Sequence, residues 1–406
     1  MACGPAAMRP DASPPVAIAA QPIQAPAPAC TLSAPCPVCP VCPPDKPTSQ
    51  EAQFQEIPWR DLPGLGQATL LDSLRAFVAG CARIHTRRPW QAACAAARVP
   101  SPALESAARE FFEANFSVYR VVAPDGSDEG LVTGYYEPVL AGRREQSSEY
   151  RFPIYGAPDD LIVVDLAELH PELRHLRLRG RLQGRRLVPY YSRAEIDASA
   201  PAFSARPLAW VANAVDLFFL QIQGSGQIEF SSGERVRMGF ADQNGHPYRS
   251  LGRTLVERGE MKLEQTSMQS IKTWAANNPE KIQDALNTNP SYVFFRELPL
   301  KRSATDTAEG PPGALGVPLT PGYSVAIDPR TIPLGAPVYL STTFPASAMP
   351  LQRLMVAQDT GGAIRGAIRA DFFWGSGNEA GTQAGRMRQQ GKMWLLWPKG
   401  EPLPRP

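Results

Sequence analysis

Three aspartates in the C-terminal part of the sequence stand where a carboxyl group could do chemistry. Asp328, Asp359 and Asp371 each lie directly beside an apolar run that has the composition of a buried strand. Turn residues follow the first two, at positions 329–330 and 360–362. A carboxylate at the end of a buried strand costs free energy unless it is hydrogen-bonded or has a function. Three such residues close together in the sequence therefore indicate an organised site.

Asp371 is the strongest candidate for catalysis among the three. It is followed by Phe372, Phe373 and Trp374, and burial among such side chains would raise its pKa because the ionised form is disfavoured there. A carboxyl that stays protonated near neutral pH can act as a general acid on a glycosidic bond. The alternative is a structural role, in which Asp371 holds the turn before Gly375.

The other two aspartates are predicted to support the site. Asp359 could cap the sharp turn at 360–362 as an Asx-turn, or it could tune Asp371 or hold a sugar hydroxyl, and the sequence leaves these roles open. Asp328 precedes a proline, which favours an extended backbone, and we expect its role to be structural.

Several segments, in a fixed order, resemble one family of bacterial cell-wall enzymes. Three of them look like its three-aspartate, double-psi β-barrel domain: 327–335 (IDPRTIPLG), 358–366 (QDTGGAIRG) and 369–375 (RADFFWG). Four more lie upstream: 134–138 (GYYEP), 223–226 (QGSG), 244–250 (NGHPYRS) and 291–295 (SYVFF). Together they resemble the membrane-bound lytic murein transglycosylase A family, from about residue 57 to 398.

The resemblance implies a mainly β fold with flanking helices, of the α+β class. A double-psi β-barrel domain would comprise residues 53–144 plus 246–400, with the three-aspartate region at 322–398. A second β domain would be inserted at 145–245, and a groove between the two would hold the glycan. Residues 1–52 are rich in Pro, Ala and Cys and read as a disordered tether.

The resemblance also implies an activity. Family members cleave the β-1,4 bond between N-acetylmuramic acid and N-acetylglucosamine in peptidoglycan and form 1,6-anhydromuramoyl products. Asp371 aligns with their single catalytic aspartate, which acts first as acid and then as base. Two alternatives remain: a hydrolase that pairs Asp371 with a second carboxylate (Asp359, Glu137 or Glu379), and a non-catalytic glycan-binding protein.

Two further segments are candidates for binding the glycan. Tyr135 and Tyr136 are adjacent in a predicted strand, so one should face the core while the other could stack on a sugar. Thr133 and Glu137 could bond sugar hydroxyls. In the segment Gln223, Gly224, Ser225 and Gly226, the glycines either let the backbone approach a ligand closely or form a hairpin turn.

The cysteines fall into three groups. Cys81 and Cys94 are candidates for a disulfide in the oxidising periplasm that the resemblance implies. Cys3, in the sequence Met-Ala-Cys-Gly, resembles the lipidated position of a bacterial lipoprotein, although no apolar segment precedes it here. The Cys36–Cys42 run has C-x-x-C spacing but no nearby histidine, and we predict no metal site. We expect His246 to form hydrogen bonds and not to bind metal.

The composition excludes some other classes of protein. The 41 Lys and Arg residues nearly balance 39 Asp and Glu residues, so no nucleic-acid partner is expected. No apolar run reaches the roughly 18 residues of a transmembrane helix. Nucleotide-binding and metallohydrolase motifs are absent, so no cofactor is implied. The expected partners are peptidoglycan glycan strands, and the resemblance implies a lipid anchor in the outer membrane, facing the periplasm.

The elements that must position these residues can be read from apolar spacing and caps. Helical spacing predicts a helix over 70–81 and further helices over 251–258, 267–276 and 280–286. Ser101 and Pro102 could begin another helix, and residues 192–195 form a capping box. Residues 131–140 read as a strand broken by Gly and Pro. Further strands are predicted at 152–155, 161–166, 187–190, 210–212, 217–223 and 227–230. From 322 to 397 we expect short strands and turns.

Overall fold

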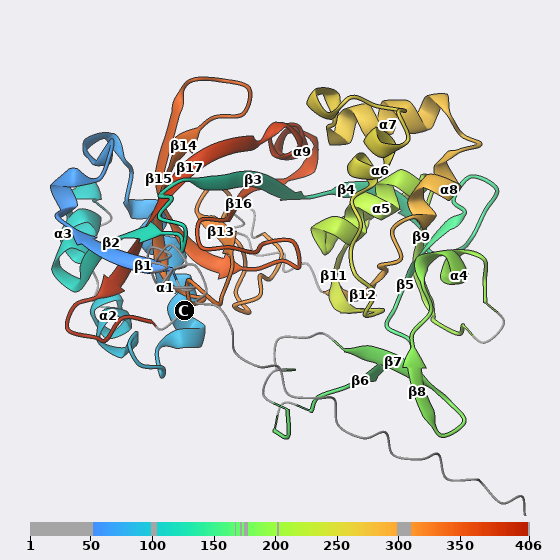
Figure 1. Ribbon diagram of the computed structural model, residues 1–406, viewed down its shortest axis with the longest axis horizontal. Coiled ribbons are helices and arrows are strands. Elements are labelled where there is room, and N and C mark those ends of the chain that lie inside the picture. Colours follow the sequence, from blue (N-terminus) through green and yellow to red (C-terminus); the bar gives the residue numbers. More distant parts are fainter. Residues whose placement is uncertain are drawn as a thin grey trace, which may run out of the picture. The chain divides into compact units, whose positions relative to one another are not determined.

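The computed structural model describes residues 52–98, 104–166, 168–170, 173, 178–200, 203–298 and 310–404 (Figure 1). Cys3, the Cys36–Cys42 run, Ser101 and Pro102 lie outside these ranges. Within them, no helix is long and apolar enough to cross a membrane. The same residues contain no cluster of three or more His, Cys, Asp or Glu side chains that could hold a metal ion.

An eight-stranded sheet carries the three aspartates. Its order is β1-β2-β17-β14-β15-β13-β16-β3, and β17 also pairs with β3, so the strands from β17 round to β3 close into a ring. The strands are β1 (Gln53–Ile57), β2 (Phe116–Val122), β3 (Gly130–Glu137), β13 (Ser324–Ile327), β14 (Pro337–Thr343), β15 (Pro350–Asp359), β16 (Ala370–Ser376) and β17 (Arg388–Pro398). The mainly β, α+β fold expected from the sequence is therefore confirmed.

One strand of this ring comes from a distant part of the chain. β3 pairs parallel to β16, with Thr133 opposite Asp371, and antiparallel to β17, with Thr133 opposite Arg388. On its other side, β16 pairs antiparallel to β13, with Asp371 opposite Ala326. Asp371 therefore lies on a strand that is hydrogen-bonded to a neighbouring strand on each edge, and this pairing fixes its backbone position.

Three helices pack against the ring and share its core: α1 (Leu71–Ile84), α2 (Gln91–Ala97) and α3 (Glu105–Asn115). Phe77 of α1 is fully buried, and its ring meets those of Phe112 and Phe116 edge to face. A disulfide joins Cys81 of α1 to Cys94 of α2, as the sequence predicted. The helix predicted over 70–81 is present and extends one turn further.

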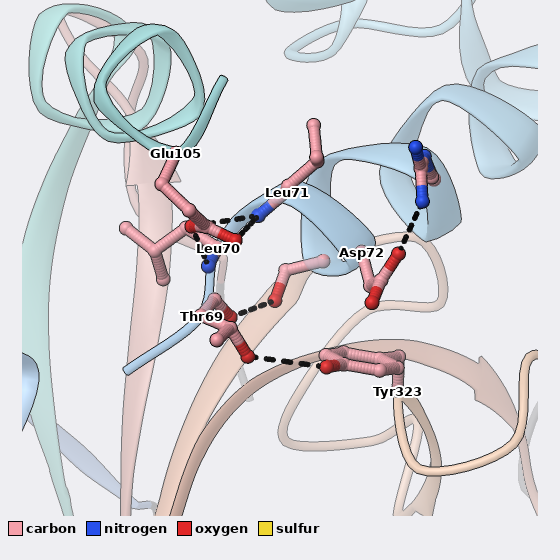
Figure 2. Close-up of polar contacts among 8 residues, drawn as sticks. Thr69, Leu70, Leu71, Asp72, Glu105 and Tyr323 are labelled. Atoms are coloured by element: carbon pink, nitrogen blue, oxygen red, sulfur yellow. Dashed lines mark hydrogen bonds and ion pairs between the residues drawn. The ribbon is translucent and has the colours of Figure 1, made fainter. Parts of the chain in front are cut away.

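The N-terminus of α1 is capped by a residue from α3 (Figure 2). The Glu105 carboxylate accepts hydrogen bonds from the backbone N–H groups of Leu70 (2.7 Å) and Leu71 (3.2 Å). These groups have no partner within the helix, and a negative charge at a helix N-terminus interacts favourably with the helix dipole. Nearby, the hydroxyls of Thr69 and Tyr323 lie 3.2 Å apart and link this end of α1 to the residue before β13.

A six-stranded sheet lies in the middle of the chain, in the order β12-β11-β10-β4-β9-β5. Its strands are β4 (Val139–Arg143), β5 (Phe152–Tyr155), β9 (Pro207–Val211), β10 (Ser225–Phe230), β11 (Arg235–Gln243) and β12 (Val293–Leu298). Figure 1 shows β3 leading directly into β4. The domain boundaries at 145 and 245 stay a prediction, while the pairing places β4 and β12, which flank the predicted insert, in this second sheet.

Helices surround the six-stranded sheet, and a small sheet extends from it. Leu217 and Leu220 of α5 pack on the sheet, while Phe218 packs toward α6, α7 and α8. The helices are α4 (Arg193–Asp197), α5 (Ala214–Gln223), α6 (Leu251–Glu257), α7 (Met268–Asn277) and α8 (Ile282–Asn287). The small sheet comprises β6 (Ile162–Val163), β7 (Arg179–Gln183) and β8 (Arg186–Pro189). Short 3₁₀ turns lie at Trp59–Asp61 (η1), Leu65–Gln67 (η2) and Leu263–Gln265 (η4).

Two local predictions were wrong. Residues 217–223 were predicted as a strand, but they form most of α5, which is buried on two sides and so is apolar nearly all round. Asn213 caps this helix by accepting from the N–H groups of residues 215 and 216, and Gly224 ends it with a left-handed φ of 74°. The second error is α9 (Gly377–Arg386), a helix within a region where only strands and turns were expected.

Candidate active site

The carboxyl of Asp371 is partly buried and accepts a short hydrogen bond. The Thr133 hydroxyl, on the neighbouring strand β3, donates to Oδ1 of Asp371 at 2.5 Å. Phe372 and Phe373 have no exposed surface, and Trp374 is half-buried. The aromatic run that follows Asp371 in the sequence thus contributes to the packed barrel.

Arg369 extends this contact by one further residue. Its Nη2 donates to the Thr133 hydroxyl oxygen at 2.9 Å, and its Nη1 donates to the backbone carbonyl of Ala370 at 2.6 Å. The result is a continuous series of hydrogen bonds from the guanidinium through the hydroxyl to the carboxyl. Arg369 was not predicted as a site residue.

Burial raises the pKa of Asp371 to about 6. The Thr133 hydrogen bond and the positive charge of Arg369 act in the opposite direction, and the negative charge of Asp359 adds a small increase. Desolvation is the dominant cause because the ionised carboxylate loses its hydration and gains only partial compensation. A carboxyl with such a pKa exchanges protons readily near neutral pH, which is the property required of a general acid.

Asp359 ends β15 and combines two roles that the sequence left open. Its Oδ1 accepts from the backbone N–H groups of Ala314 and Thr360, each at 2.9 Å, so it does cap the turn that follows. Burial nevertheless raises the pKa of Asp359 above its usual value. The negative charge of Asp359 in turn raises the pKa of Asp371. Asp359 is thus both a turn cap and an electrostatic neighbour of Asp371.

Tyr135 lies close to both of these aspartates. Its ring packs on Phe373, with the centroids 5.1 Å apart. Its buried hydroxyl faces Asp359 closely enough to lower the pKa of that carboxyl, without the geometry of a standard hydrogen bond. Burial, followed by the charges of Asp359 and Asp371, raises the pKa of Tyr135 well above its usual value. Tyr135 is therefore the tyrosine of the pair that belongs to the site.

Tyr136 points to the other side of β3 and belongs to a packed cluster. It is 7% exposed and contacts Ala380 and Ala384 of α9, together with Met268 at the start of α7. This matches the expectation that one of the two tyrosines is core. Through this cluster α9, which packs on β3 and β16 of the eight-stranded sheet, contacts α7, one of the helices beside the six-stranded sheet.

Glu137, predicted to bind sugar hydroxyls, is instead fully engaged within the protein. Its side chain has no exposed surface and accepts two hydrogen bonds from Arg237, at 2.6 and 3.1 Å. Gln227 and the Ser376 hydroxyl also donate to it, at 2.8 and 2.7 Å. Such a carboxylate has no surface available for a ligand. It ties the end of β3 to β16 and to the six-stranded sheet, and we do not assign it a glycan contact.

Asp328 is also structural, as expected. It is 2% exposed and accepts hydrogen bonds from the guanidinium of Arg330 and from the backbone N–H of Gly366 at 2.9 Å. Burial opposes its ionisation, but the bonds from Arg330 and Gly366 outweigh it and hold the pKa of Asp328 below its usual value. This carboxylate stays ionised and fixes the turn after β13.

The segment from Gln223 to Gly226 connects α5 to β10. The Gln223 side-chain oxygen accepts from the backbone N–H of Tyr136 at 3.1 Å, so this segment touches β3 directly. Gly226 is buried, and a Cβ there would lie 2.3 Å from Leu220 and 3.0 Å from the carbonyl of Pro138. Ser225 begins β10 opposite Gly239. Close packing explains Gly226, while the predicted glycan contacts of Gln223, Gly224 and Ser225 stay a prediction.

The NGHPYRS segment, which follows β11, is bonded to the connections before α4 and before β12. Asn244 is fully buried, and its amide donates to the carbonyls of Tyr191 and Pro290, both at 2.8 Å. His246 lies 2.7 Å from the carbonyl of Tyr190 through its Nε2 and is a hydrogen-bonding residue, as expected. These contacts explain the segment without a direct role in chemistry.

Comparison with known proteins adds a family to this geometry. The MltA specific insert domain matches residues 131–296, and the 3D domain matches residues 323–397. Together these cover more than half of the chain. The chain belongs to the membrane-bound lytic murein transglycosylase A family.

Individual relatives agree with this assignment. Membrane-bound lytic murein transglycosylase A of Escherichia coli K12 is 36% identical over 274 residues, which is 65% of this chain and 64%, just under two thirds, of the relative. The crystal structure of MltA from Neisseria gonorrhoeae matches with a TM-score of 0.75 and 40% identity, over 87% of this chain and 94% of that one. E. coli MltA with bound chitohexaose matches with a TM-score of 0.63 and 28% identity, over 85% and 91% of the two chains.

Proposed function

We propose that this protein is a lytic transglycosylase that cleaves the β-1,4 bond between N-acetylmuramic acid and N-acetylglucosamine in peptidoglycan. The observation that carries the proposal is the state of Asp371, a partly buried carboxyl with a pKa of about 6 on an inner barrel strand. Membership of the family supports the substrate class. A relative that binds chitohexaose, an oligomer of N-acetylglucosamine, supports a glycan as ligand.

The reaction needs one carboxyl that gives a proton and then takes one. Protonated Asp371 donates to the oxygen that bridges the two sugars, the bond from C1 of N-acetylmuramic acid to that oxygen breaks, and positive charge develops at C1. The Asp371 carboxylate then removes the proton from the O6 hydroxyl of the same sugar, and O6 bonds to C1. The 1,6-anhydro product forms without water, and Asp371 returns to its protonated state.

An intramolecular nucleophile makes a second catalytic carboxylate unnecessary. The O6 hydroxyl is tethered to the reacting carbon, and such groups have very high effective concentrations. This fits the other two aspartates: Oδ1 of Asp359 accepts from two backbone N–H groups, and Asp328 accepts from Arg330 and from the backbone N–H of Gly366. In the proposal, Asp359 raises the pKa of Asp371, and Asp328 fixes the turn after β13. Tyr135 and Thr133 lie next to the Asp371 carboxyl.

The organisation of the whole molecule follows from the same proposal. We propose that a barrel domain (53–144 plus 246–400) and an inserted β domain (145–245) bind the glycan in a groove between them, with Gln223, Gly224 and Ser225 on the insert side. Lipidation at Cys3 would attach the enzyme to the outer membrane, facing the periplasm. The names of the relatives, which call them membrane-bound, support an association with the cell envelope.

Mass spectrometry of peptidoglycan digests tests the reaction and the residue together. Wild-type protein should release muropeptides that are lighter by one water molecule than their hydrolysed equivalents, and Asp371→Asn should release none. Hydrated reducing ends from the wild type would instead establish a hydrolase. Binding to peptidoglycan without release of fragments by either protein would leave a glycan-binding module.

A further inference from the structure

We propose that Arg369 is a positioning residue: it fixes the direction of the Thr133 hydroxyl and thereby assigns Oδ2 of Asp371 as the oxygen that exchanges the proton with the glycan. The inference rests on the proposed function, because it concerns the same carboxyl. The site gains Arg369, and Oδ2 is identified as the oxygen that transfers the proton. Both conclusions follow from the donors and acceptors in contact with Asp371.

The side chain of Arg369 is held by several bonds to neighbouring strands. It lies one residue before β16 and is half-buried. Nη1 donates to the carbonyl of Ala370 at 2.6 Å and weakly to that of Leu131 at 3.4 Å, which leaves Nη2 directed at Thr133 (2.9 Å). A planar guanidinium that is held by one nitrogen presents the other in a fixed direction.

The direction of the Thr133 hydroxyl then follows from the inventory of protons. A guanidinium can only donate, so the Thr133 oxygen must accept from Arg369. The hydroxyl has a single proton of its own, and the short contact to Oδ1 of Asp371 (2.5 Å) is where that proton goes. Without Arg369 the hydroxyl could rotate and accept a proton from Asp371 instead.

This direction determines which oxygen of Asp371 carries the acid proton. In a protonated carboxyl the carbonyl-type oxygen is the better acceptor, and Thr133 donates to Oδ1. The proton is therefore favoured on Oδ2, which receives no donor from the described residues in the hydrogen bonds of Asp371. Because the proton on Oδ2 is not donated to Thr133, it is available for donation to the glycan.

Arg369 has a second, separable effect through its charge. The charged or ionisable groups that act on Asp371 are Arg369 before β16, Asp359 on β15 and Tyr135 on β3. The positive charge of Arg369 lowers the pKa of Asp371, while Asp359 raises it. Removing the charge together with the fork should therefore raise the pKa more than removing the fork geometry alone.

Five variants separate the two effects from a merely structural role. Arg369→Met removes charge and donors, Arg369→Lys keeps the charge but loses the fork, and Thr133→Val removes the hydroxyl that Thr133→Ser keeps. The fifth combines Arg369→Met with Thr133→Val. Urea denaturation of each identifies variants that fail to fold. Release of anhydro products is then measured against pH, and the pKa of Asp371 is followed in the free protein by the ¹³Cγ signal, assigned with Asp371→Asn.

The expected result is a coupled loss of rate. Arg369→Met and Thr133→Val should each lower kcat by about tenfold, roughly the value of one hydrogen bond to a charged group. The double variant should lose little more than either one, because both changes break the same series of bonds. Thr133→Ser should retain most of the rate. The pKa of Asp371 should rise more in Arg369→Met than in Arg369→Lys, which keeps the charge.

Two results would overturn the inference. Rate losses that multiply in the double variant would mean that Arg369 and Thr133 act independently, and an unchanged kcat in folded Arg369→Met would mean that Arg369 is only a structural link. The NMR titration keeps the two proposals apart. If the wild type forms no anhydro product but the pKa of Asp371 still responds to Arg369→Met, the proposed reaction fails while the contact between these residues stands.

Discussion

Replacing Asp371 by Asn should make the protein more stable as well as inactive, and the gain should depend on pH. The pKa of Asp371 is about 6 in the folded protein, against an ordinary value of 3.8. The folded state therefore binds more protons than the unfolded state between about pH 4 and pH 6, and the free energy of unfolding falls as the pH rises through that window. An amide does not titrate, so Asp371→Asn escapes this loss.

The size of the effect follows from the shift. Two pKa units at about 1.4 kcal/mol each set an upper bound of about 3 kcal/mol, reached above pH 6. Asp371 is only partly buried, so solvent screening should reduce the gain to about 1–2 kcal/mol. The amide oxygen of Asn can still accept from Thr133, and the substitution should therefore cause little loss of packing or hydrogen bonding.

Urea denaturation of wild type and Asp371→Asn, followed by tryptophan fluorescence at about pH 4.5 and about pH 8, measures the difference. Asp328→Asn is the matched control with the opposite sign. Its carboxyl has a lowered pKa, so it contributes stability above its ordinary pKa that is lost as the pH falls through the folded value. Asp328→Asn should therefore destabilise the protein at neutral pH. If Asp371→Asn were less stable than wild type at pH 8, or if its effect were the same at both pH values, the assignment of a raised pKa would be refuted.

Three further predictions concern activity and stability. Product release should fall as the pH rises through about 6, because Asp371 must begin protonated. Thr133→Val should shift this fall to higher pH, since the Thr133 hydrogen bond lowers the pKa of Asp371. A rate that is flat from pH 5 to 8 would contradict the prediction. Glu105→Ala should cost about 1 kcal/mol of unfolding free energy, because it removes the cap of α1. Glu110→Ala, at an exposed position of α3, the helix that also carries Glu105, is the control in thermal denaturation. Glu137→Ala should cost about 3–5 kcal/mol because it leaves a buried guanidinium without its carboxylate, and a loss below 1 kcal/mol would show that the pair is not a structural tie.

Local signals in the sequence predicted the elements that local physics determines. The capping box at Ser192 and Glu195 is present, with both reciprocal hydrogen bonds. The helix over 70–81 and the Cys81–Cys94 disulfide also depend on residues close in sequence. By contrast, residues 217–223 were misread because a helix buried on two sides has no apolar periodicity. Its signals were the caps, Asn213 and Gly224, which lie just outside the apolar run.

The sequence named the central carboxyl of the candidate site, Asp371, but could not give the contacts around it. Asp371 stood out because of the apolar residues beside it, and its role as the central carboxyl stays the basis of the proposal. The contact of Thr133 with Asp371, and the burial of Glu137 by Arg237, depend on strand pairing between distant segments, which no local pattern encodes. Arg369 carried no signal of its own, since its importance lies in the residue it bonds. The helix α9 was hidden by its glycines, of which Gly381 allows it to pack closely on Tyr136.

The closure of the ring through β3 also sets an order of events while the chain is being made. β3 is synthesised early, but its partners β16 and β17 lie more than 230 residues later, as the separation of 238 between Thr133 and Asp371 records. The six-stranded sheet, from β4 to β12, can form in the interval, and pairings over such distances form slowly. Asp371 thus meets its partners only after the chain has been made as far as β17. A chain that still lacks β16 and β17 would therefore lack the contacts of Asp371 on which the proposed reaction depends.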